Sequence, residues 1–574
     1  MKNAREQIAL NLSMSLLDNM ADYVENFAEI KKDRIAIIEH DTGEKISWKA
    51  FNKAIEAFAA KLLSIGLKKG DIVATSLPLL KEHIYLIYAC YRTGIIVAPL
   101  DLRLKAEEIK YCLNRIKPAA YFFLGRTPVA DFRPIVSEVM KDISFVKHWV
   151  QFQKEEDEII DGAIGITKFA SDIKWQFIKS RFTKSVERAR DLVQRRDPCL
   201  IIFTTGSTGS PKPAMLCHEN ILIQNVGLYA GFDMNDEDVM LVNLPPSHVG
   251  CITEQLATTI FAGGTSVILH VFNAEKSLNA IQQHKVTVIG QIPALFNLEW
   301  NLPDYNKYDL SSLRFIIYGG QEVSAEFLKK MKEMAPKIGT GLGLTETAGF
   351  CTYTDPDATV EEIARSIGYS MAVTPLSIRA PMKSDGTAGE ELPSGQIGEI
   401  CFSGPQVFLG YYDDPENTAR AISKDGICYT GDIGSYDGDG LHFAGRAKFV
   451  IKPKGYQVYP QDVNNHISAK LADKVANVAC IGAPHDIYIE AIIAFVEPYP
   501  GVELTAQEVM DACLDISSYS RPSHVVILEP GGMPLNRVAK VDLMELKTRA
   551  LGIIEDLRVK GLWDRDVVKR GGVA

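Results

Sequence analysis

Helical and strand-like segments alternate through the first 130 residues, and this alternation restricts the possible fold more than any other feature of the chain. The stretch DIVATSLP (71–78) is typical of a buried strand, KEHIYLIYACYRTG (81–94) of a helix that ends at a glycine, and IIVAPL (95–100) of a second strand. Before them, apolar residues recur at helical spacing between a predicted N-cap, Ser47, and Gly66. This strand–helix–strand succession predicts a parallel β-sheet packed between helices.

The same alternation returns from about residue 220 to 344. It predicts a helix at 220–232 and strands at 238–246, 286–293 and 313–320. The charged stretch 179–197 predicts one solvated helix face leading into the strand CLIIF (199–203).

After Gly389 the sequence predicts β segments separated by Gly and Pro. Beyond residue 445 the pattern predicts a compact α+β tail. The predicted fold class is therefore α/β. We expect a large N-terminal domain, residues 1–445, of parallel-rich sheets packed with helices plus a β subdomain. A small α+β C-terminal domain is expected at residues 446–574.

Composition excludes several classes of protein. A chain of 574 residues with a net charge of −10 lacks the basic excess of a general nucleic-acid binder. No apolar run approaches the roughly 18 residues of a membrane span, and polar residues interrupt any signal-peptide core. The ten cysteines show no C-x-x-C or metal-ligand spacing. We interpret them as buried reduced thiols of a cytoplasmic protein.

A loop rich in Gly, Ser and Thr, TTGSTGSPKPAM (204–215), is the first candidate site. It departs from the Walker A pattern because Pro211 and Pro213 occupy the positions, counted from Gly206, where the pattern needs its last Gly and its Ser/Thr. Proline has no N–H to donate, so a wrapped phosphate nest is not expected. The loop still offers N–H groups, hydroxyls and Lys212 to a polyphosphate. Taken alone, it is equally well explained as a Gly-rich hairpin turn.

Four further segments carry candidate side chains. YGGQEV (318–323) ends a predicted strand with two glycines that let a flat ring approach the backbone. GLGLTET (341–347) combines a hydroxyl for a phosphate with a carboxylate for Mg²⁺. YTGDIG (429–434) supplies an acceptor for ribose hydroxyls, and MPLNRVAKVDLMELK (533–547) places Lys540 between a loop and a helix. Each segment alone is more often a turn or solvated surface than a site.

Together these segments resemble the adenylate-forming superfamily, which comprises acyl-CoA synthetases, firefly luciferase and the adenylation domains of peptide synthetases. The resemblance extends from about Lys45 to Lys547. It rests on motifs in the family's order: FTTGSTGSPK, PPSH, GGQE, GLGLTE, YTGD, GRAKFVIKPKGYQVYP and the C-terminal lysine segment. The acyl-CoA synthetase branch is the one indicated.

The resemblance implies a reaction in two halves. ATP activates a carboxylate to an acyl-adenylate with release of pyrophosphate, and a thiol, commonly that of coenzyme A, then displaces AMP. It implies that Thr345, Glu346 (which holds Mg²⁺) and Lys540 are catalytic. The implied ATP and AMP site comprises Thr204, Thr205, Gly206, Ser207, Thr208, Gly209, Lys212, Gly319, Gly320, Gln321, Glu322, Gly341, Leu342, Gly343, Leu344, Asp432 and Arg446.

The resemblance also implies a mobile C-terminal domain that rotates between the two halves of the reaction. Lys448 falls at the hinge position. Rotation would withdraw Lys540 and bring Lys452, Gly455 and Tyr456 toward the adenylate to form the CoA tunnel. The implied partners are thus a small carboxylic acid, ATP and CoA, with no nucleic acid or transmembrane segment. A homodimer is compatible with the sequence.

Several positions depart from the family pattern. Pro213 and Ala539 stand where glycine is usual, Leu342 replaces an aromatic residue that stacks on adenine, and Phe449 occupies a usually polar place. None of these changes removes a charged group that the chemistry needs. We therefore expect an active enzyme.

The acid is the least determined part of the prediction. The resemblance places the acyl pocket at His248, Gly250, Cys251, Glu254 and Ile292. Gly250 predicts room for an acid larger than acetate, such as a medium-chain, alicyclic or aromatic acid. A lone carboxylate is costly to bury in an apolar pocket. Glu254 is therefore expected to face solvent, to pair with a cation or to bind a polar group of the substrate.

Three other functions remain possible from sequence. The first is an adenylation enzyme that loads a carrier protein. The 34 residues after Lys540 are too few for an attached carrier domain, so such an enzyme would be freestanding. A luciferase-type oxygenase is not called for by any motif. A degenerate nucleotide-binding sensor would be expected to lack Lys540 or Glu346, and both are present.

Overall fold

The computed structural model describes residues 2–204, 211–321, 323–453, 456–536 and 540–564. Its largest sheet has eight strands in the spatial order β19 (Gly410–Tyr411), β9 (Lys212–Cys217), β8 (Pro198–Thr204), β4 (Ile96–Pro99), β3 (Ile72–Ser76), β5 (Ala120–Leu124), β6 (His148–Phe152) and β7 (Ile164–Gly165). The six strands from β8 to β7 run parallel, as predicted. Strands β9 and β19 extend one edge in the antiparallel sense, which the pattern did not predict.

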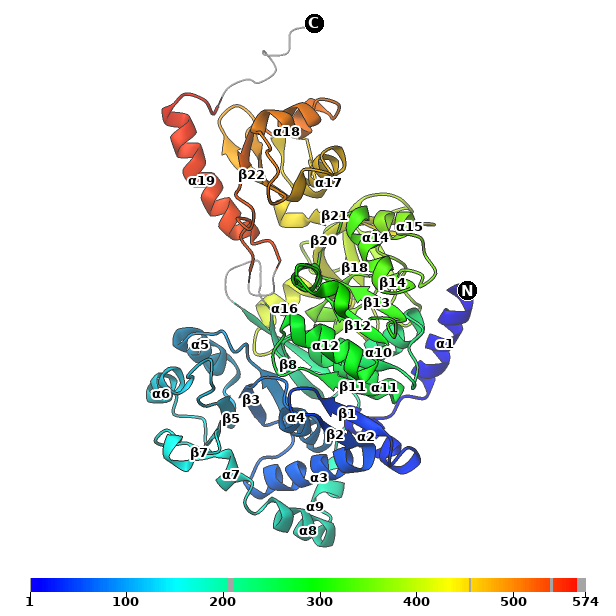
Figure 1. Ribbon diagram of the computed structural model, residues 1–574, viewed down its shortest axis with the longest axis vertical. Coiled ribbons are helices and arrows are strands. Elements are labelled where there is room, and N and C mark those ends of the chain that lie inside the picture. The colour runs from blue at the N-terminus through cyan, green and yellow to red at the C-terminus, as the bar shows by residue number, and fades with distance from the viewer. Residues whose placement is uncertain (1, 205–210, 322, 454–455, 537–539, 565–574) are drawn as a thin grey trace, which may run out of the picture.

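A second sheet of seven strands continues the body of the molecule (Figure 1). Its order is β14 (Lys337–Gly339), β13 (Phe315–Tyr318), β12 (Val288–Gln291), β10 (Val239–Val242), β11 (Thr265–Ile268), β1 (Ile35–Glu39) and β2 (Glu44–Ser47). All neighbours are parallel except β1 and β2. Parallel strands end at a common edge, and the loops that follow β12 and β13 lead into the site.

The remaining strands form smaller sheets. An antiparallel sheet contains β17 (Leu376–Arg379), β18 (Gly398–Phe402), β20 (Cys428–Asp437) and β21 (Gly440–Arg446), and β15 (Gly343–Leu344) pairs with β16 (Gly349–Phe350). The C-terminal sheet contains β22 (Val475–His485), β23 (Ile489–Pro498) and β24 (His524–Ile527). It stands apart from the main body in Figure 1. The predicted α/β class is confirmed.

Helices cover these sheets. The α-helices are α1 (Lys2–Met14), α2 (Met20–Ile30), α3 (Trp48–Ser64), α4 (Lys81–Thr93), α5 (Ala106–Ile116), α6 (Arg133–Asp142), α7 (Ile166–Phe169), α8 (Ile173–Thr183), α9 (Ser185–Arg190), α10 (His218–Gly231), α11 (Thr258–Ala262), α12 (Ala274–His284), α13 (Pro293–Trp300), α14 (Ala325–Met334), α15 (Val360–Arg365), α16 (Pro415–Ala421), α17 (Pro460–Lys470), α18 (Ala506–Ala512) and α19 (Leu543–Val559).

Local signals set the ends of the predicted helices. The Ser47 hydroxyl accepts a hydrogen bond from the Ala50 N–H at 3.3 Å and so caps α3, as expected. Gly94 ends α4 with φ +70°, a left-handed conformation that glycine adopts without strain.

The stretch 179–197, expected to present a solvated helix face, is largely exposed but is not one continuous helix. The segment is divided between the end of α8 and the separate helix α9, because Lys184 adopts a left-handed conformation with φ +53° between them. Neither glycine nor proline marks this break, so residue types alone do not predict it.

The largest apolar core joins the two large sheets and contains fully buried aromatic residues such as Trp48, Phe51 and Tyr88. Separate clusters of apolar side chains lie on the two faces of the C-terminal sheet. All ten cysteines are buried with free thiols. None of the described helices combines the length and the apolar character needed to cross a lipid bilayer.

Candidate active site

A cavity of about 2220 Å³ lies where the main body meets the C-terminal part of the chain. The predicted residues that line it are Thr204, Lys212, His248, Gly250, Glu254, Ile292, Gly319, Gly320, Gln321, Gly341, Leu342, Gly343, Leu344, Thr345, Glu346, Asp432, Arg446, Lys448 and Lys540. These residues lie on or beside strands of three sheets, on the loops that follow β12 and β13, on the turn near residue 250 and on the loop before α19. The fold thus brings together side chains that are up to 336 positions apart in the sequence.

Some predicted residues cannot be placed or lie elsewhere. Thr205, Gly206, Ser207, Thr208, Gly209, Glu322 and Gly455 fall outside the described residues. Lys452 and Tyr456 do not line the cavity. The Lys452 N–H donates to Glu490, and the Tyr456 ring stacks on Tyr519 with centroids 4.4 Å apart.

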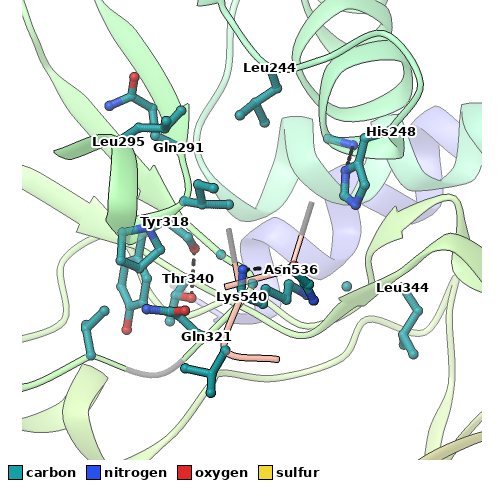
Figure 2. A pocket seen from close by; sticks show the side chains of 18 of the residues that line it. Leu244, His248, Gln291, Leu295, Tyr318, Gln321, Thr340, Leu344, Asn536 and Lys540 are labelled. Carbon is teal, nitrogen blue, oxygen red and sulfur yellow. Dashed lines mark hydrogen bonds between the residues drawn. The ribbon is translucent and has the colours of Figure 1, made fainter. Parts of the chain in front are cut away.

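Lys540 reaches the cavity from the short segment that precedes α19. Its N–H donates to the Asn536 side chain at 3.0 Å, and the Asn536 N–H donates back to the Lys540 carbonyl at 2.7 Å. Figure 2 shows this segment between His248 on one side and Tyr318 and Gln321 on the other. Burial lowers the pKa of Lys540, and the neighbouring charge of Arg446 acts in the same direction. The lysine is therefore a poorly hydrated cation that an anionic group would stabilise.

Gly320 makes room for this lysine. A Cβ atom at Gly320 would lie 3.1 Å from Cε of Lys540, and the residue has φ +94°. Both the space and the backbone conformation thus favour glycine at this position. The glycine pair expected to admit a flat ring also admits the lysine side chain.

His248 stands opposite Lys540. Burial lowers the pKa of His248 to about 4, and the positive charge of Lys540 contributes. Its Nδ1 accepts a hydrogen bond from the Gly250 N–H at 3.0 Å, so the proton of the neutral ring lies on Nε2. The ring is therefore a neutral hydrogen-bond donor at pH 7.

Glu254 lines the same part of the cavity. Burial raises its pKa to about 7, whereas a hydrogen bond from the Phe350 backbone and the charge of Lys540 act to lower it. Its side chain packs so closely on Gly349 that a Cβ there would lie 2.6 Å from Oε1. Glu254 therefore does not face bulk solvent, which was one of the three expectations for it. Lys540 is a cation close enough to lower the pKa of Glu254.

Gly250 and Glu254 belong to a π-helical segment, η2 (Gly250–Ala257). The wider turn leaves backbone groups that side chains must satisfy, and such segments are frequent at functional sites. Thr253 donates to the Val249 and Ala348 carbonyls, and Gln255 accepts from the N–H groups of Asn243 and Leu244. The segment is thereby fixed against β10 and β16.

Cys251 differs from its expected position. It is fully buried in the core and does not line the cavity. The π-helical turn presents Gly250 and Glu254 to the cavity and directs Cys251 away from it.

Asp432 and Arg446 pair across the antiparallel strands β20 and β21. Arg446 Nε lies 3.0 Å from Oδ1 of Asp432, which is almost completely buried. Burial raises the pKa of Asp432, while Arg446 and Lys540 act to lower it. The pair presents one acceptor and one cation at the cavity wall.

The sequence did not predict the role of Tyr411. Its hydroxyl donates a hydrogen bond of 2.6 Å to Oε1 of Glu346, and Nζ of Lys212 lies 5.2 Å from the centre of its ring. Strand β19 brings Tyr411 beside β9 and thus links the carboxylate of one motif to the lysine of another. No charge or motif spacing marks this tyrosine in the sequence.

Positive charge accumulates at the cavity. Burial lowers the pKa of Lys448, and the charges of Arg446, Lys547 and Lys212 add to this effect. Mutual repulsion of this kind is relieved by a bound polyanion. Thr204 and Lys212 pair across β8 and β9, so the two ends of the predicted phosphate loop lie side by side at the same cavity.

Comparison with known proteins decides the family. The family model described as AMP-binding enzyme matches residues 24–412, and that of the AMP-binding enzyme C-terminal domain matches residues 451–540. The chain belongs to the AMP-binding enzyme family. The prediction of an enzyme of the adenylate-forming superfamily is thereby confirmed.

Two curated relatives and one solved structure illustrate the similarity. The indoleacetate–CoA ligase of Aromatoleum aromaticum is 28% identical over 92% of this chain and 98% of its own length. The medium-chain fatty-acid–CoA ligase of Escherichia coli is 24% identical over 89% and 87%. The anthranilate CoA ligase AuaEII, solved with anthranoyl-AMP, shares the fold with a TM-score of 0.80 at 20% identity, over 95% of this chain and 99% of its own.

Proposed function

We propose that this enzyme activates a carboxylic acid with ATP to an acyl-adenylate and then transfers the acyl group to coenzyme A. The observation that carries the proposal is the convergence of Lys212, Arg446, Lys448 and Lys540 on one cavity that also contains Glu346. A polyphosphate beside a carboxylate substrate is the ligand that such a charge distribution favours. The names of the relatives support the same class of reaction.

In the proposed ATP site, Lys212 and Thr204 bind the β- and γ-phosphates together with the adjoining loop. Thr345 donates to the α-phosphate, Asp432 accepts from the ribose hydroxyls and Arg446 holds that carboxylate in place. The backbone from Gly319 to Gln321, with Leu342, lines the adenine.

Mg²⁺ fits the residues present at Glu346. One carboxylate beside substrate phosphates is a common protein contribution to a magnesium site, and the Tyr411 hydroxyl orients this carboxylate. The described residues contain no cluster of three or more side chains that would bind a metal without phosphate. When bound, Mg²⁺ would neutralise phosphate charge.

Lys540 has the central role in the first half-reaction. The substrate carboxylate attacks the α-phosphorus, the new P–O bond forms and pyrophosphate leaves. The buried ammonium lies where it stabilises negative charge shared by the two reacting groups. A preorganised cation in a poorly hydrated cavity is more effective than one in water, because the protein need not reorganise around the charge.

We place the acyl group beside Leu244, Gly250, Glu254 and Ile292. Gly250 leaves space bounded by Leu244, His248 and Glu254. This supports a medium-chain, alicyclic or aromatic acid rather than acetate. Glu254 is the one acidic group among these residues, and it favours acids that can contact or hydrogen-bond a carboxyl group beside the acyl chain.

The second half-reaction requires a different arrangement. Lys540 occupies the cavity while Lys452 and Tyr456 remain outside it, as the family's adenylation state requires. Rotation about Lys448 would withdraw Lys540 from the cavity and bring in Lys452 and Tyr456. The CoA thiol would then enter, attack the acyl carbonyl and displace AMP. Ten buried reduced thiols support a cytoplasmic location for this chemistry.

The test is an assay of both half-reactions with a panel of acids. We expect acid-dependent exchange of pyrophosphate into ATP, and CoA-dependent release of AMP with one class of acid. Exchange without CoA turnover would instead indicate a carrier-loading enzyme, and no reaction with any acid would indicate a nucleotide sensor. Lys540→Ala should slow adenylation far more than thioester formation from preformed acyl-AMP.

A further inference from the structure

Helix α8 carries large apolar side chains on its outer surface. Trp175 is 62% exposed, Ile178 47% and Phe182 85%. Their spacing of three and four residues places them in one row along the helix. Trp175 is the one tryptophan of the chain that the structure leaves largely exposed.

The outward position of this row is fixed by contacts on the other side of the helix. Ile173 packs against the main core, and Ser180 is buried. Asp172 at the start of α8 accepts from Lys61 of α3 at 2.6 Å, and Arg181 lies 3.3 Å from Glu56 of α3. The helix is therefore held on α3 with apolar residues on both faces, which is unusual for a helix at a protein surface.

Basic residues surround the apolar row. Between Ile173 and Arg190 the sequence has six basic residues and one acidic residue, in a chain whose net charge is −10. Lys174 and Lys179 are exposed on α8 itself, and Arg188 is exposed on α9. The patch formed by α8 and α9, here called the α8 face, thus has the opposite sign to the whole molecule.

We propose that the α8 face docks on the surface of an anionic lipid bilayer. Trp175 and Phe182 would enter the boundary between headgroups and acyl chains, while the lysines would contact lipid phosphates. A second copy of the chain fits less well, because a symmetric contact would place two positive patches against each other. The α8 face lies at the end of the molecule opposite the C-terminal sheet, so docking would leave the C-terminal domain unobstructed (Figure 1).

The experiment is sedimentation of the full-length protein with lipid vesicles. Vesicles of phosphatidylcholine alone are compared with vesicles of equal parts phosphatidylcholine and phosphatidylglycerol. We expect binding to the anionic vesicles that is at least about tenfold stronger than to the neutral ones and that decreases with added salt. A blue shift of tryptophan emission should accompany binding and should be lost in Trp175→Phe, which keeps an aromatic ring.

Two variants test the two parts of the face separately. Trp175→Ser with Phe182→Ser removes apolar area, and Lys174→Glu with Lys179→Glu reverses charge. Each should weaken vesicle binding at least about tenfold. The control variant Val129→Ser with Val559→Ser alters two exposed apolar residues elsewhere and should bind like the wild type. Unchanged melting temperatures establish that the variants are folded.

Three results would overturn the proposal. Absence of sedimentation with anionic vesicles is the first, and binding that neither double variant weakens is the second. The third is a dimer in solution that Trp175→Ser with Phe182→Ser converts to a monomer, because the face would then be occupied by a second copy. None of these results bears on the ligase assay, so the two proposals fail independently.

Discussion

Gly320 is the residue on which the position of Lys540 depends most directly. In Gly320→Ala the new methyl group would press on the lysine side chain from a backbone with φ +94°. Non-glycine residues are strained there by about 1–2 kcal/mol. We expect pyrophosphate exchange to fall at least about tenfold, while thioester formation from synthetic acyl-AMP changes by at most about twofold.

Gly395→Ala is the matched control for this prediction. Gly395 also has a positive φ, but no atom lies within 4 Å of its Cβ position. The control therefore introduces backbone strain without contact with Lys540. Equal loss of exchange in both variants would show that strain alone, and not the position of the lysine, lowers the activity.

Tyr411 provides a test of the proposed magnesium site. Tyr411→Phe removes the hydroxyl that donates to Glu346 but retains the ring beneath Lys212. Because the carboxylate would lose its orienting partner, the Mg²⁺ concentration for half-maximal exchange should rise about threefold to tenfold. A magnesium titration measures this. If Tyr411→Phe had an unchanged Mg²⁺ dependence while Glu346→Gln was inactive, the Tyr411 hydroxyl would have no part in orienting Glu346 for Mg²⁺.

Glu254 should make the stability of the protein depend on pH. Its pKa rises from 4.5 to about 7 on folding, so the folded state binds the proton more tightly than the unfolded chain. Its contribution to the free energy of unfolding therefore decreases as pH rises from about 4.5 to about 7, and is constant above. The total decrease is on the order of 3 kcal/mol.

Melting temperatures of the wild type and Glu254→Gln measure this effect. Gln cannot titrate, so the melting temperature of the variant relative to that of the wild type should be higher near about pH 8 than near about pH 5. Lys540 and His248 are present in both proteins, and their own titration cancels in the difference to first order. A difference that is independent of pH would place Glu254 in a more hydrated setting than the structure does.

At this scale most of the described residues that were predicted for the site line the cavity, charged and uncharged alike, and Tyr411 was missed. Lys540, Glu346 and Asp432 lie in motifs whose order identifies them. Tyr411 is 65 positions from Glu346, and contacts between distant segments bring them together: β19 pairs with β9, and the Phe408 N–H donates to the Glu346 carbonyl. Cys251 was predicted to line the acyl pocket but lies in the core. A motif gives the order of residues, but it does not show that they form a π-helix, whose wider turn changes the direction of each side chain.

Among the elements, the π-helical segment η2 determines the shape of the proposed acyl pocket. It orients Gly250 so that a side chain there would project between Leu244, His248 and Glu254. Gly250→Leu should therefore lower kcat/KM for bulky acids at least about tenfold, and much less for short ones, because it fills the space that the larger acyl group needs.

The ratio of kcat/KM for a long acid to that for a short acid measures this change. Gly250→Ala is the control, since one methyl group takes up little of the space. An unchanged ratio in Gly250→Leu would show that the acyl group lies elsewhere.

Element prediction succeeded where the pattern is local. Strands β3 and β4 and helices α3 and α4 follow from apolar periodicity and from caps at Ser47 and Gly94. The break between α8 and α9 was missed because Lys184 adopts φ +53° without a residue type that favours it. The antiparallel edge of the large sheet depends on contacts between distant segments, which periodicity does not report.

For the whole molecule, the proposed hinge at Lys448 is the feature that would couple the two half-reactions. Lys448→Pro would fix φ near −65° and restrict rotation of the C-terminal domain. Because Lys540 already occupies the cavity, adenylation should be lowered only by the loss of the Lys448 charge, and therefore by less than thioester formation. Thioester formation should fall at least about tenfold, as measured by AMP release with and without CoA. A proportional loss in both would contradict a rotation about this residue.

In the proposed site, the two ends of the reacting acid contact different parts of the chain. Its acyl group would contact Leu244, Gly250, Glu254 and Ile292 of the main body, whereas its carboxylate would contact Lys540, which comes from beyond residue 535. Recognition and activation are thus encoded in separate stretches of sequence. Substitutions that broaden or narrow the range of accepted acids can accumulate in one stretch while the other is preserved, which makes this architecture readily diversified by evolution and by engineering.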